Sequence, residues 1–183
     1  MKQMVIETER LVMRRWVPDD LVPFAAINAD PEVMRYYPSP LTRDQTKDLM
    51  DRMQSHFERH GFGLWALETQ MDHAFVGFTG LMVPRFEAHF TPCVEIGWRV
   101  ARAHWGRGLA TEAALAAAEY GFQTLALKEI LAFTTPANTA SRRVMEKIGM
   151  TYEFDFDHPL IEKGHPLKRH VLYRLPAPES AGG

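Results

Sequence analysis

The sequence predicts an α+β fold in which helices flank a central twisted, mixed but mostly antiparallel sheet of about six or seven strands. Three observations lead to this class. Apolar side chains alternate over residues 94–100, which is the period of a strand with two different faces. Apolar residues recur at helical spacing over residues 42–57. The strand at 94–100 leads through a glycine-bearing turn directly into an alanine-rich helix, which predicts a strand–helix–strand unit in the middle of the chain.

The other elements follow from the same two periods. The expected strands cover residues 11–16, 62–68, 75–82, 94–100, 130–135, 151–156 and 168–175. The expected helices cover residues 19–28, 42–57, 108–122 and 138–148, with a further helical turn that begins at Pro31. We expect the unit at 94–135 to supply a local parallel pair of strands, or a splayed equivalent of one.

Three residues predict helix ends. Asp19 can cap the first helix, because its carboxylate can accept hydrogen bonds from free N–H groups. Thr42 with Gln45 three residues later has the spacing of a capping box. Gly149 is expected to stop the last helix in the left-handed conformation.

Length and charge limit the classes of function. The 183 residues fit a single domain, expected over 1–175, with a small polar tail at 176–183 that is expected to be disordered. A net charge of −2 with interspersed signs gives no support to nucleic-acid or membrane binding. Cys93 is the only cysteine, which excludes an internal disulfide. With no signal peptide at the start and no apolar run of membrane-spanning length, we expect a cytoplasmic protein.

The glycine-bearing turn before residue 109 predicts a phosphate site. The first N–H groups of a helix have no internal partner, and the aligned peptide dipoles favour negative charge there. Gly106 and Gly108 lack a Cβ, so the backbone can approach a phosphate closely. The alternative is a turn that serves only close helix–sheet packing, which the alanines of the following helix also suit.

Two common phosphate-binding loops do not match this turn. The string G-x-x-x-x-G-K-[ST] of nucleotide-binding loops is absent. The dinucleotide pattern G-x-G-x-x-G/A fails at its third position, which is Thr111, and Glu129 precedes its strand instead of ending it. What remains is a pyrophosphate that carries a long arm.

Several motifs resemble the GNAT N-acetyltransferases. Residues 105–110 (WGRGLA) resemble that family's acyl-CoA loop, Q/R-x-x-G-x-G/A, with tryptophan in place of the usual Gln or Arg. Residues 8–11 (TERL) and 78–80 (FTG) resemble its first and third strands, and residues 138–150 its last motif. The resemblance covers almost the whole chain. The string WGRGLATEA is most similar to the branch that contains bacterial ribosomal-protein N-terminal acetyltransferases.

The resemblance implies a GNAT-like sheet, acetyl-CoA as the acyl donor and no metal. It places the CoA pyrophosphate on the amides of the glycine-bearing turn, and the pantetheine arm on the strand before it and on the last helix. The residues so implicated are Trp98, Arg99, Val100, Trp105, Gly106, Arg107, Gly108, Leu109, Ala110, Thr111 and Asn138.

Transfer to an amine needs a base and a proton for the leaving thiolate. Glu95 is the candidate base, with a surface carboxylate paired to Arg99 as the alternative. Many members of the family carry a tyrosine acid in the last helix, but Met145 stands at that position and cannot donate a proton. Ser141, one turn earlier on the same face, is the candidate acid. Its alternatives are a hydrogen bond to the CoA arm and an ordinary surface hydroxyl.

The acceptor is expected to be the α-amine of a protein or peptide. An α-amine with a pKa of about 7.8 is neutral about one time in ten at pH 7, far more often than a lysine. A small-molecule amine is the close alternative, and a CoA-binding module without catalysis is the alternative from another class. Acceptor choice is assigned to the segments 30–40, 84–92 and 154–168. The sequence leaves the oligomeric state open, a homodimer included.

Two further features favour ordinary roles. His56 and His60 lie four residues apart, but without a HExxH string they are expected on a solvated helix surface instead of at a metal. Cys93 has no histidine motif beside it and is expected to be inert.

Overall fold

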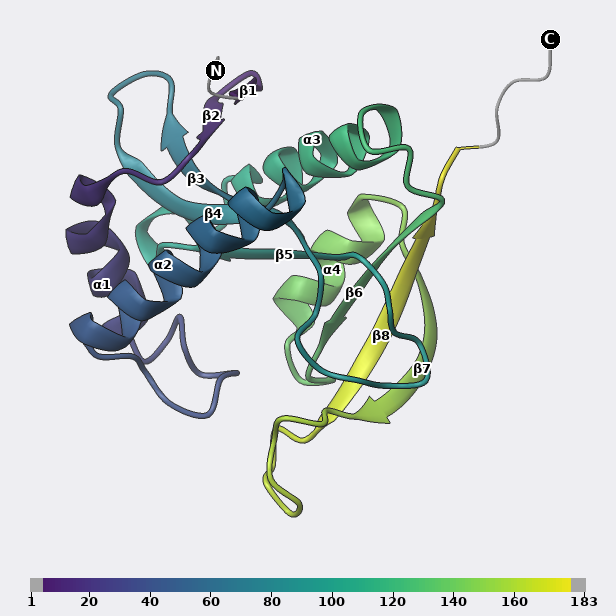
Figure 1. Ribbon diagram of the computed structural model, residues 1–183. Coiled ribbons are helices and arrows are strands. Elements are labelled where there is room, and N and C mark those ends of the chain that lie inside the picture. Colours follow the sequence, from purple (N-terminus) through teal and green to yellow (C-terminus); the bar gives the residue numbers. More distant parts are fainter. Residues whose placement is uncertain (1–4, 179–183) are drawn as a thin grey trace, which may run out of the picture.

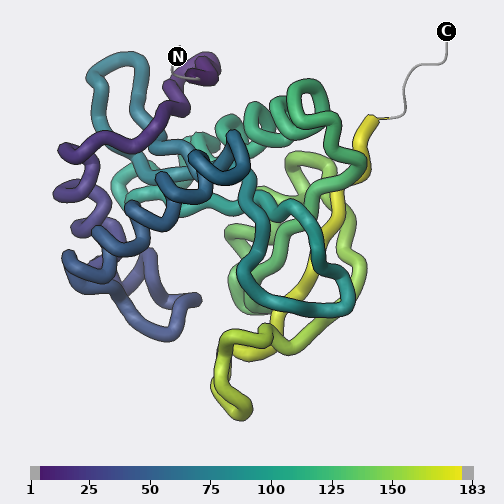
Figure 2. The backbone as a smooth tube through the Cα atoms, in the orientation of Figure 1, coloured from purple at the N-terminus to yellow at the C-terminus, as the bar shows by residue number. Residues whose placement is uncertain are grey.

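The computed structural model describes residues 5–178, which form one sheet of eight strands with four α-helices. Figure 1 shows their arrangement, and Figure 2 shows the path of the backbone in the same view. The strands are β1 (Ile6–Glu7), β2 (Leu11–Arg14), β3 (Leu64–Thr69), β4 (Phe75–Met82), β5 (Glu95–Val100), β6 (Glu129–Thr134), β7 (Thr151–Asp157) and β8 (Arg169–Pro176). The α-helices are α1 (Leu21–Ala29), α2 (Arg43–His60), α3 (Leu109–Gln123) and α4 (Thr139–Lys147). Two short 3₁₀ helices, Pro18–Asp20 and Arg102–His104, precede α1 and α3.

The mixed, mostly antiparallel fold predicted from the sequence is confirmed. The strand order is β1-β2-β3-β4-β5-β6-β8-β7, and every neighbouring pair except β5–β6 is antiparallel. The described chain has one strand more than expected. The additional strand is β1, whose two residues are too few to show a period.

Two of the three predicted helix ends are confirmed. Thr42 accepts a hydrogen bond from the Gln45 N–H at 3.2 Å, and the Gln45 side chain accepts one from the Thr42 N–H at 2.9 Å. Gly149 adopts a φ of +92° just after α4, and its N–H donates to the Glu146 carbonyl at 3.0 Å. The left-handed conformation is the reason for glycine at this position.

The first helix begins differently from the prediction. Asp19 does not cap it; the neighbouring Asp20 is buried and accepts from the Val17 N–H at 2.9 Å. Arg14 pairs with the same carboxylate through two hydrogen bonds of 2.8 Å each. The sequence pattern could not separate these adjacent aspartates, because the partner arginine comes from another element. The helical turn expected from Pro31 is a single one, in which the Met34 N–H donates to the Asp30 carbonyl at 3.0 Å, and the rest of residues 31–39 forms only turns and bends.

The sheet opens in its middle, between β5 and β6. These two parallel strands share one paired position, Glu95 with Leu131, and the Leu131 N–H donates to the Val94 carbonyl at 3.0 Å. Beyond this point they separate, with β1 to β5 on one side and β6 to β8 on the other (Figure 1). The edge of β5 that faces β6 is therefore free over most of its length, as expected for a splayed pair.

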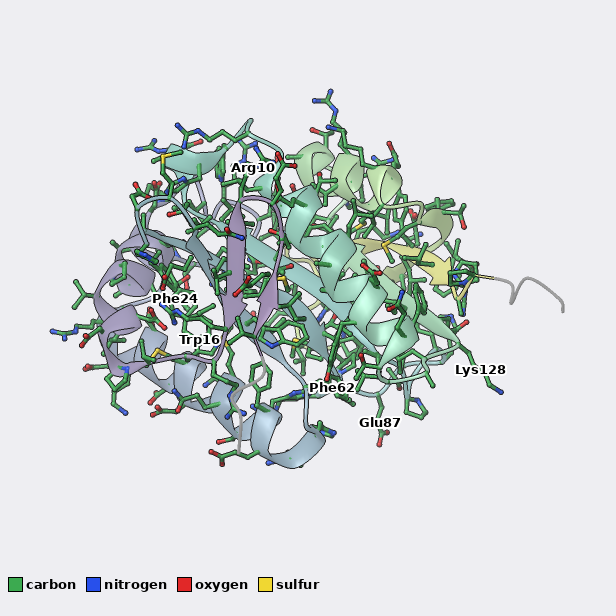
Figure 3. The ribbon with its side chains drawn as sticks, turned by 90° about the horizontal axis from the view of Figure 1, so that it is seen from above. Arg10, Trp16, Phe24, Phe62, Glu87 and Lys128 are labelled. Carbon is green, nitrogen blue, oxygen red and sulfur yellow. The ribbon has the colours of Figure 1, made fainter. Side chains whose placement is uncertain are left out.

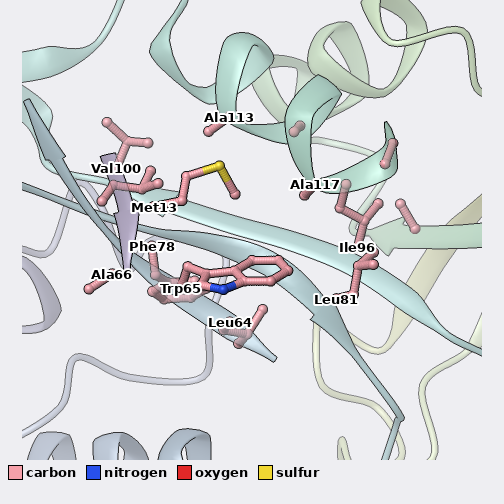
Figure 4. Packing of buried hydrophobic residues seen from close by; sticks show 14 of the residues in the cluster. Met13, Leu64, Trp65, Ala66, Phe78, Leu81, Ile96, Val100, Ala113 and Ala117 are labelled. Atoms are coloured by element: carbon pink, nitrogen blue, oxygen red, sulfur yellow. The ribbon is translucent and has the colours of Figure 1, made fainter. Parts of the chain in front are cut away.

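Helix α3 packs closely on the sheet through its alanines. Ala113 and Ala117 are fully buried and lie above Ile96 and Val100 of β5, as Figure 4 shows. Small side chains let the helix approach the strands, so the first turn of α3 is held near the end of β5. The alanines of α3 therefore do serve close packing of the helix on the sheet. This packing does not exclude a phosphate site, because it involves the buried face of the helix and not its first turn.

An aromatic cluster holds α1 on the other face. The ring of Phe24 lies 4.8 Å from that of Trp16 and 5.9 Å from that of Phe78 in β4. Figure 3 places Trp16 and Phe24 beside α1, away from α3. The side chains of β5 that face α1 consequently enter a different environment from those that face α3.

The chain before β2 is tied to the start of α3. The Glu112 carboxylate accepts hydrogen bonds from the Thr8 hydroxyl at 2.7 Å and from the Arg10 N–H at 2.8 Å. The Arg10 guanidinium also binds this carboxylate and donates to the Arg107 carbonyl at 2.8 Å (Figure 3). The residues TERL therefore have a structural role, because they fix the glycine-bearing turn from outside.

Part of the predicted tail belongs to the fold. Pro176 ends β8, and the Ala177 N–H donates to the Lys128 carbonyl at 2.8 Å, so the boundary predicted at 175 is slightly early. The remaining tail residues, 179–183, lie outside the described residues. Within residues 5–178 no helix has the length and apolar character needed to cross a membrane.

Enlarging a buried alanine of α3 tests this packing. We expect Ala117→Leu to lower the free energy of unfolding by about 1–3 kcal/mol, because a fully packed interface must move to accept the side chain. The matched control is Glu119→Leu, which adds the same side chain at an exposed position of the same helix. Urea unfolding of both variants is the measurement. Equal losses in the two variants would contradict tight packing at Ala117.

Candidate active site

A cavity of about 900 Å³ occupies the opening between β5 and β6. One wall is β5 itself, from Glu95 to Arg99. The opposite walls come from β6, α4 and the β7–β8 hairpin, and α2 with the α1–α2 segment closes the front. The segments 30–40, 84–92 and 154–168, which were predicted to choose the acceptor, all contribute residues to this cavity.

The glycine-bearing turn lies just beyond the end of β5. Gly106 and Gly108 have φ values of +73° and +77°, which only glycine adopts without strain. An added Cβ at Gly106 would meet no atom within 4 Å, so the conformation and not crowding explains this glycine. The turn thus stands open to solvent on the side where the helix begins.

Six consecutive N–H groups of this turn, from residues 106 to 111, have no acceptor within the described chain. The first N–H of α3 that finds one belongs to Glu112, which donates to the Gly108 carbonyl at 3.0 Å. Unpaired donors at a helix start attract an anion, because the peptide dipoles reinforce them. The arrangement fits a pyrophosphate, as expected from the sequence.

Trp105 folds back onto the strand. Its indole N–H donates to the Val100 carbonyl at 2.8 Å, and the ring remains 44% exposed. This contact occupies the carbonyl of Val100, the last residue of β5, and fixes the start of the turn. Because the indole N–H is used in this way, only the exposed ring of Trp105 is available for the predicted contact with the cofactor.

The backbone of β5 alternates between its two neighbours. The Ala101 N–H donates to Val76, next to β4, whereas the Val94 carbonyl accepts from β6. Since alternate residues of a strand direct their polar groups to the same side, Trp98 presents its N–H and carbonyl to the open edge. Arg99 presents its own to Phe78 in β4, with which it is paired. Of the stretch 98–100, Arg99 is thus turned away from the open edge. The Val100 carbonyl is occupied by the Trp105 indole, so Trp98 has the backbone groups that a pantetheine arm could use.

Glu95 lies at the point where β5 and β6 part. Its carboxyl lines the cavity and has no hydrogen-bond or ion-pair partner among residues 5–178. Removal from water raises the pKa of this carboxyl to about 8. The ion pair with Arg99, considered as the alternative role, does not form. A carboxyl with this pKa can take up and release a proton near neutral pH.

The start of α4 faces Glu95 across the cavity. Asn138 caps this helix, since its side-chain oxygen accepts from the Ser141 N–H at 3.2 Å and its amide donates to the Thr134 hydroxyl at 3.0 Å. The Ser141 hydroxyl accepts from the Trp98 indole N–H at 3.3 Å. Met145 is buried on the same side of the helix. Ser141 therefore keeps a proton to donate toward the cavity.

His56 has a structural role that the sequence did not show. Its Nδ1 lies 2.8 Å from the Phe62 carbonyl, and its Nε2 accepts from the Val83 N–H at 3.0 Å. This pattern requires a neutral ring, and burial lowers its pKa. The expectation of a solvated surface is wrong for this histidine.

Residues 5–178 contain no group of three or more His, Cys, Asp or Glu side chains arranged for a metal.

Histidines also pack among aromatic rings at the far wall. The ring of His158 lies 4.7 Å from that of Phe86 and 4.9 Å from that of His170. Burial lowers the pKa of His158 to about 4, so this histidine is neutral at pH 7.

Cys93 is a separate case. Burial raises the pKa of its thiol to about 11, which agrees with an inert thiol.

Two features of the cavity were missed from the sequence. Tyr36 reaches across its mouth and donates to the Ala137 carbonyl at 3.0 Å, which ties the α1–α2 segment to the start of α4. The side chain of Arg99 is buried against α1 and Tyr37. Neither contact has a local signal, because the partners are distant in the chain.

The chain matches known acetyltransferases over most of its length. The family model of the acetyltransferase (GNAT) domain matches residues 10–151. An uncharacterized Bacillus subtilis protein, YkkB, is 37% identical over 134 residues, which are 73% of this chain and 77% of that protein. An Aspergillus fumigatus FsC-acetyl coenzyme A-N(2)-transacetylase is 33% identical over 168 residues, which cover 83% of this chain and 71% of that protein.

Solved structures agree. A GNAT-family acetyltransferase from Bacillus anthracis superimposes with a TM-score of 0.79 at 27% identity, covering 94% of this chain and 98% of that one. The ribosomal-protein-S5-alanine acetyltransferase of Vibrio fischeri has the same fold, with a TM-score of 0.76 at 16% identity over 96% and 98% of the two chains. The chain belongs to the GNAT acetyltransferases, and the protein is an acyltransferase.

The raised pKa of Glu95 predicts a dependence of stability on pH. A glutamate in the unfolded chain has its ordinary pKa of 4.5, whereas the folded protein raises the pKa of Glu95 to about 8. Folding then takes up a proton over this range, so stability falls as the pH rises through it. The glutamine of the Glu95→Gln variant cannot ionise. The difference in Tm, variant minus wild type, should therefore increase from pH 5 to pH 8. Exposed Glu58→Gln is the control. A Tm difference that stays constant with pH would contradict the raised pKa.

Proposed function

We propose that this acyltransferase moves an acetyl group from acetyl-CoA directly to a primary amine within a ternary complex. The observation that carries the proposal is the run of six free N–H groups at 106–111, which adjoins a strand with a free edge and leads to a half-buried carboxyl in the cavity. The pyrophosphate would bind these groups. The pantetheine arm would extend along Trp98 as an added strand and bring the thioester near Glu95.

The proposed reaction uses few groups of the protein. The neutral amine attacks the thioester carbonyl carbon, and its proton passes to the Glu95 carboxylate through a water molecule. The C–S bond then breaks, and the thiolate takes a proton from Ser141 or from solvent. A thiol with a pKa of about 8.5 is already a fair leaving group, so the acid has the lesser task.

The proposed acceptor is an α-amine, of a protein or peptide in the first place. At pH 7 a carboxyl with a pKa of about 8 is mostly protonated, so only a small fraction of the molecules has a carboxylate that can accept a proton. Such a base suits an amine that is often neutral without help, and an α-amine meets this condition better than a lysine. A small-molecule amine is the second candidate, favoured by the transacetylase of Aspergillus fumigatus among the relatives.

Turnover with two acceptor panels tests the enzyme. Acetyl-CoA consumption is measured with N-terminal peptides and with small amines, and each acetylated product is identified by mass. Product with peptides supports the first acceptor class, and product with small amines alone supports the second. Tight acetyl-CoA binding without turnover on any amine would contradict catalysis and leave a CoA-binding module.

Glu95→Gln tests the base. We expect kcat/KM to fall by about 10²–10⁴-fold, because proton transfer by a positioned base contributes this much. The wild-type rate should rise with pH up to about 8, the pKa of Glu95. An α-amine titrates in the same range, so the variant reports the share of the rise that belongs to the amine. A variant with the full wild-type rate and profile would remove Glu95 from the mechanism.

Gly108→Ala tests the phosphate site. A Cβ at this position strains a φ of +77° and lies 3.6 Å from the Arg10 guanidinium that holds the turn, so the substitution disturbs the backbone proposed to bind the pyrophosphate. We expect acetyl-CoA affinity, measured by calorimetry, to fall at least about tenfold, which corresponds to ~1.4 kcal/mol. Gly164→Ala is the matched control, because Gly164 has a φ of +88° with open space around it in the β7–β8 hairpin. Equal affinity in both variants would contradict the placement.

A further inference from the structure

Arg99 projects from β5 into an enclosed position on the α1 side of the cavity. Its side chain is only 8% exposed, and its guanidinium lies 4.3 Å from the ring of Tyr37 and 5.2 Å from that of Phe78. Nη1 donates to the Asn28 side-chain oxygen at 2.6 Å. The head group is therefore held in place by two rings and a neutral amide.

The other edge of this guanidinium has no partner. Nε is buried and makes no hydrogen bond, and Nη2 finds no acceptor in the described chain. No carboxylate of residues 5–178 forms an ion pair with Arg99. A buried cation without a counter-ion is costly, and Nη2 is the unpartnered donor of this edge that a carboxylate in the cavity can reach. The free edge thus has the chemistry of an anion site.

The other charged side chains of the cavity are mostly positive, like Arg99. Its basic side chains are Arg52, Arg59, Arg85 and Arg99, whereas Glu95 is its only acidic one. His158 of its far wall is neutral, as described above. A positively charged, partly enclosed cavity attracts anions and disfavours polycationic amines.

Glu95 and Arg99 share one face of β5. They stand four residues apart, about 13 Å along the strand, and side chains at this spacing point to the same side. Gly97 lies between them, and a Cβ built on it would meet no atom within 4 Å. The floor between the proposed base and the buried guanidinium is therefore open to a bound molecule.

From these contacts we infer that Arg99 binds a carboxylate of the acceptor, so that the substrate is an amine that also carries a negative charge. This rests on the acetyl transfer proposed above and specifies its acceptor. The phosphates of the donor have their own site at the glycine-bearing turn, and the pantetheine arm has no charge that Arg99 could bind. The carboxylate belongs either to a free amino acid or to an acidic residue close to a peptide N-terminus.

Matched acceptors that differ only in this charge test the inference. L-alanine is compared with L-alaninamide, and a peptide amide that begins Ala-Asp with one that begins Ala-Asn. We expect kcat/KM to favour the acid of at least one pair by about 10–100-fold, since a hydrogen-bonded charge contributes about 1.5–3 kcal/mol. A carboxylate next to an amine favours its protonated form, so unaided chemistry would favour the amide. The preferred pair identifies the source of the carboxylate.

Variants of Arg99 assign the preference. Arg99→Met should remove the acid preference and leave the KM of acetyl-CoA unchanged, and Arg99→Lys should restore part of it. Arg43→Gln, on the exposed start of α2 and outside the cavity, should keep both. Equal rates for acid and amide in the wild type would overturn the inference. So would an Arg99→Met variant that keeps the preference, or one that raises only the KM of acetyl-CoA.

A binding experiment separates this inference from the proposed function. N-acetyl-L-alanine and N-acetyl-L-alaninamide are titrated by calorimetry into wild type and Arg99→Met, each saturated with CoA. Tighter binding of the acid by wild type alone supports the anion site even where no amine is acetylated, in which case only the proposed transfer fails. Equal binding of the two probes by wild type, together with acetylation of neutral amines, overturns the anion site and leaves the transfer standing.

Discussion

The single paired position between β5 and β6 is the constraint on which the rest of the structure depends. Glu95 and Leu131 join the two halves of the sheet, and beyond them the strands separate. Unpaired backbone groups of a strand are costly when buried, so an edge of this kind persists where solvent or a ligand satisfies it. The cavity, the free edge at Trp98 and the position of the Glu95 carboxyl all result from this one divergence.

Two ionisable side chains of β5 lie on one face of the strand in different environments. Glu95 sits where the strands part, and removal from water raises the pKa of its carboxyl to about 8. Arg99 lies toward the other end of the same face, between aromatic rings, with one edge satisfied by Asn28 and the other free. Alternation along a strand places both side chains on the face away from α3.

The elements with a repeating pattern were predictable. The seven expected strands and four expected helices all occur, because the apolar residues that mark each of them are close together in the chain. The capping box at Thr42 and the glycine stop at Gly149 were also readable, since both partners lie within a few residues. The two-residue strand β1 and the choice between Asp19 and Asp20 were not, because a short strand has no period and Asp20 is selected by Arg14 of another element.

By itself, the sequence determined the α+β class, the turn with Gly106 and Gly108 before a helix, and the resemblance to GNAT acetyltransferases, since all of these depend on residues close together in the chain. Only the tertiary structure decided the environment of Glu95, the burial of Arg99 without a carboxylate, and the contact of Tyr36 with Ala137. A pKa and an unpaired charge are set by every group that packs around them. Those groups come here from α1, β4, α4 and the α1–α2 segment, and no local pattern of the sequence brings them together.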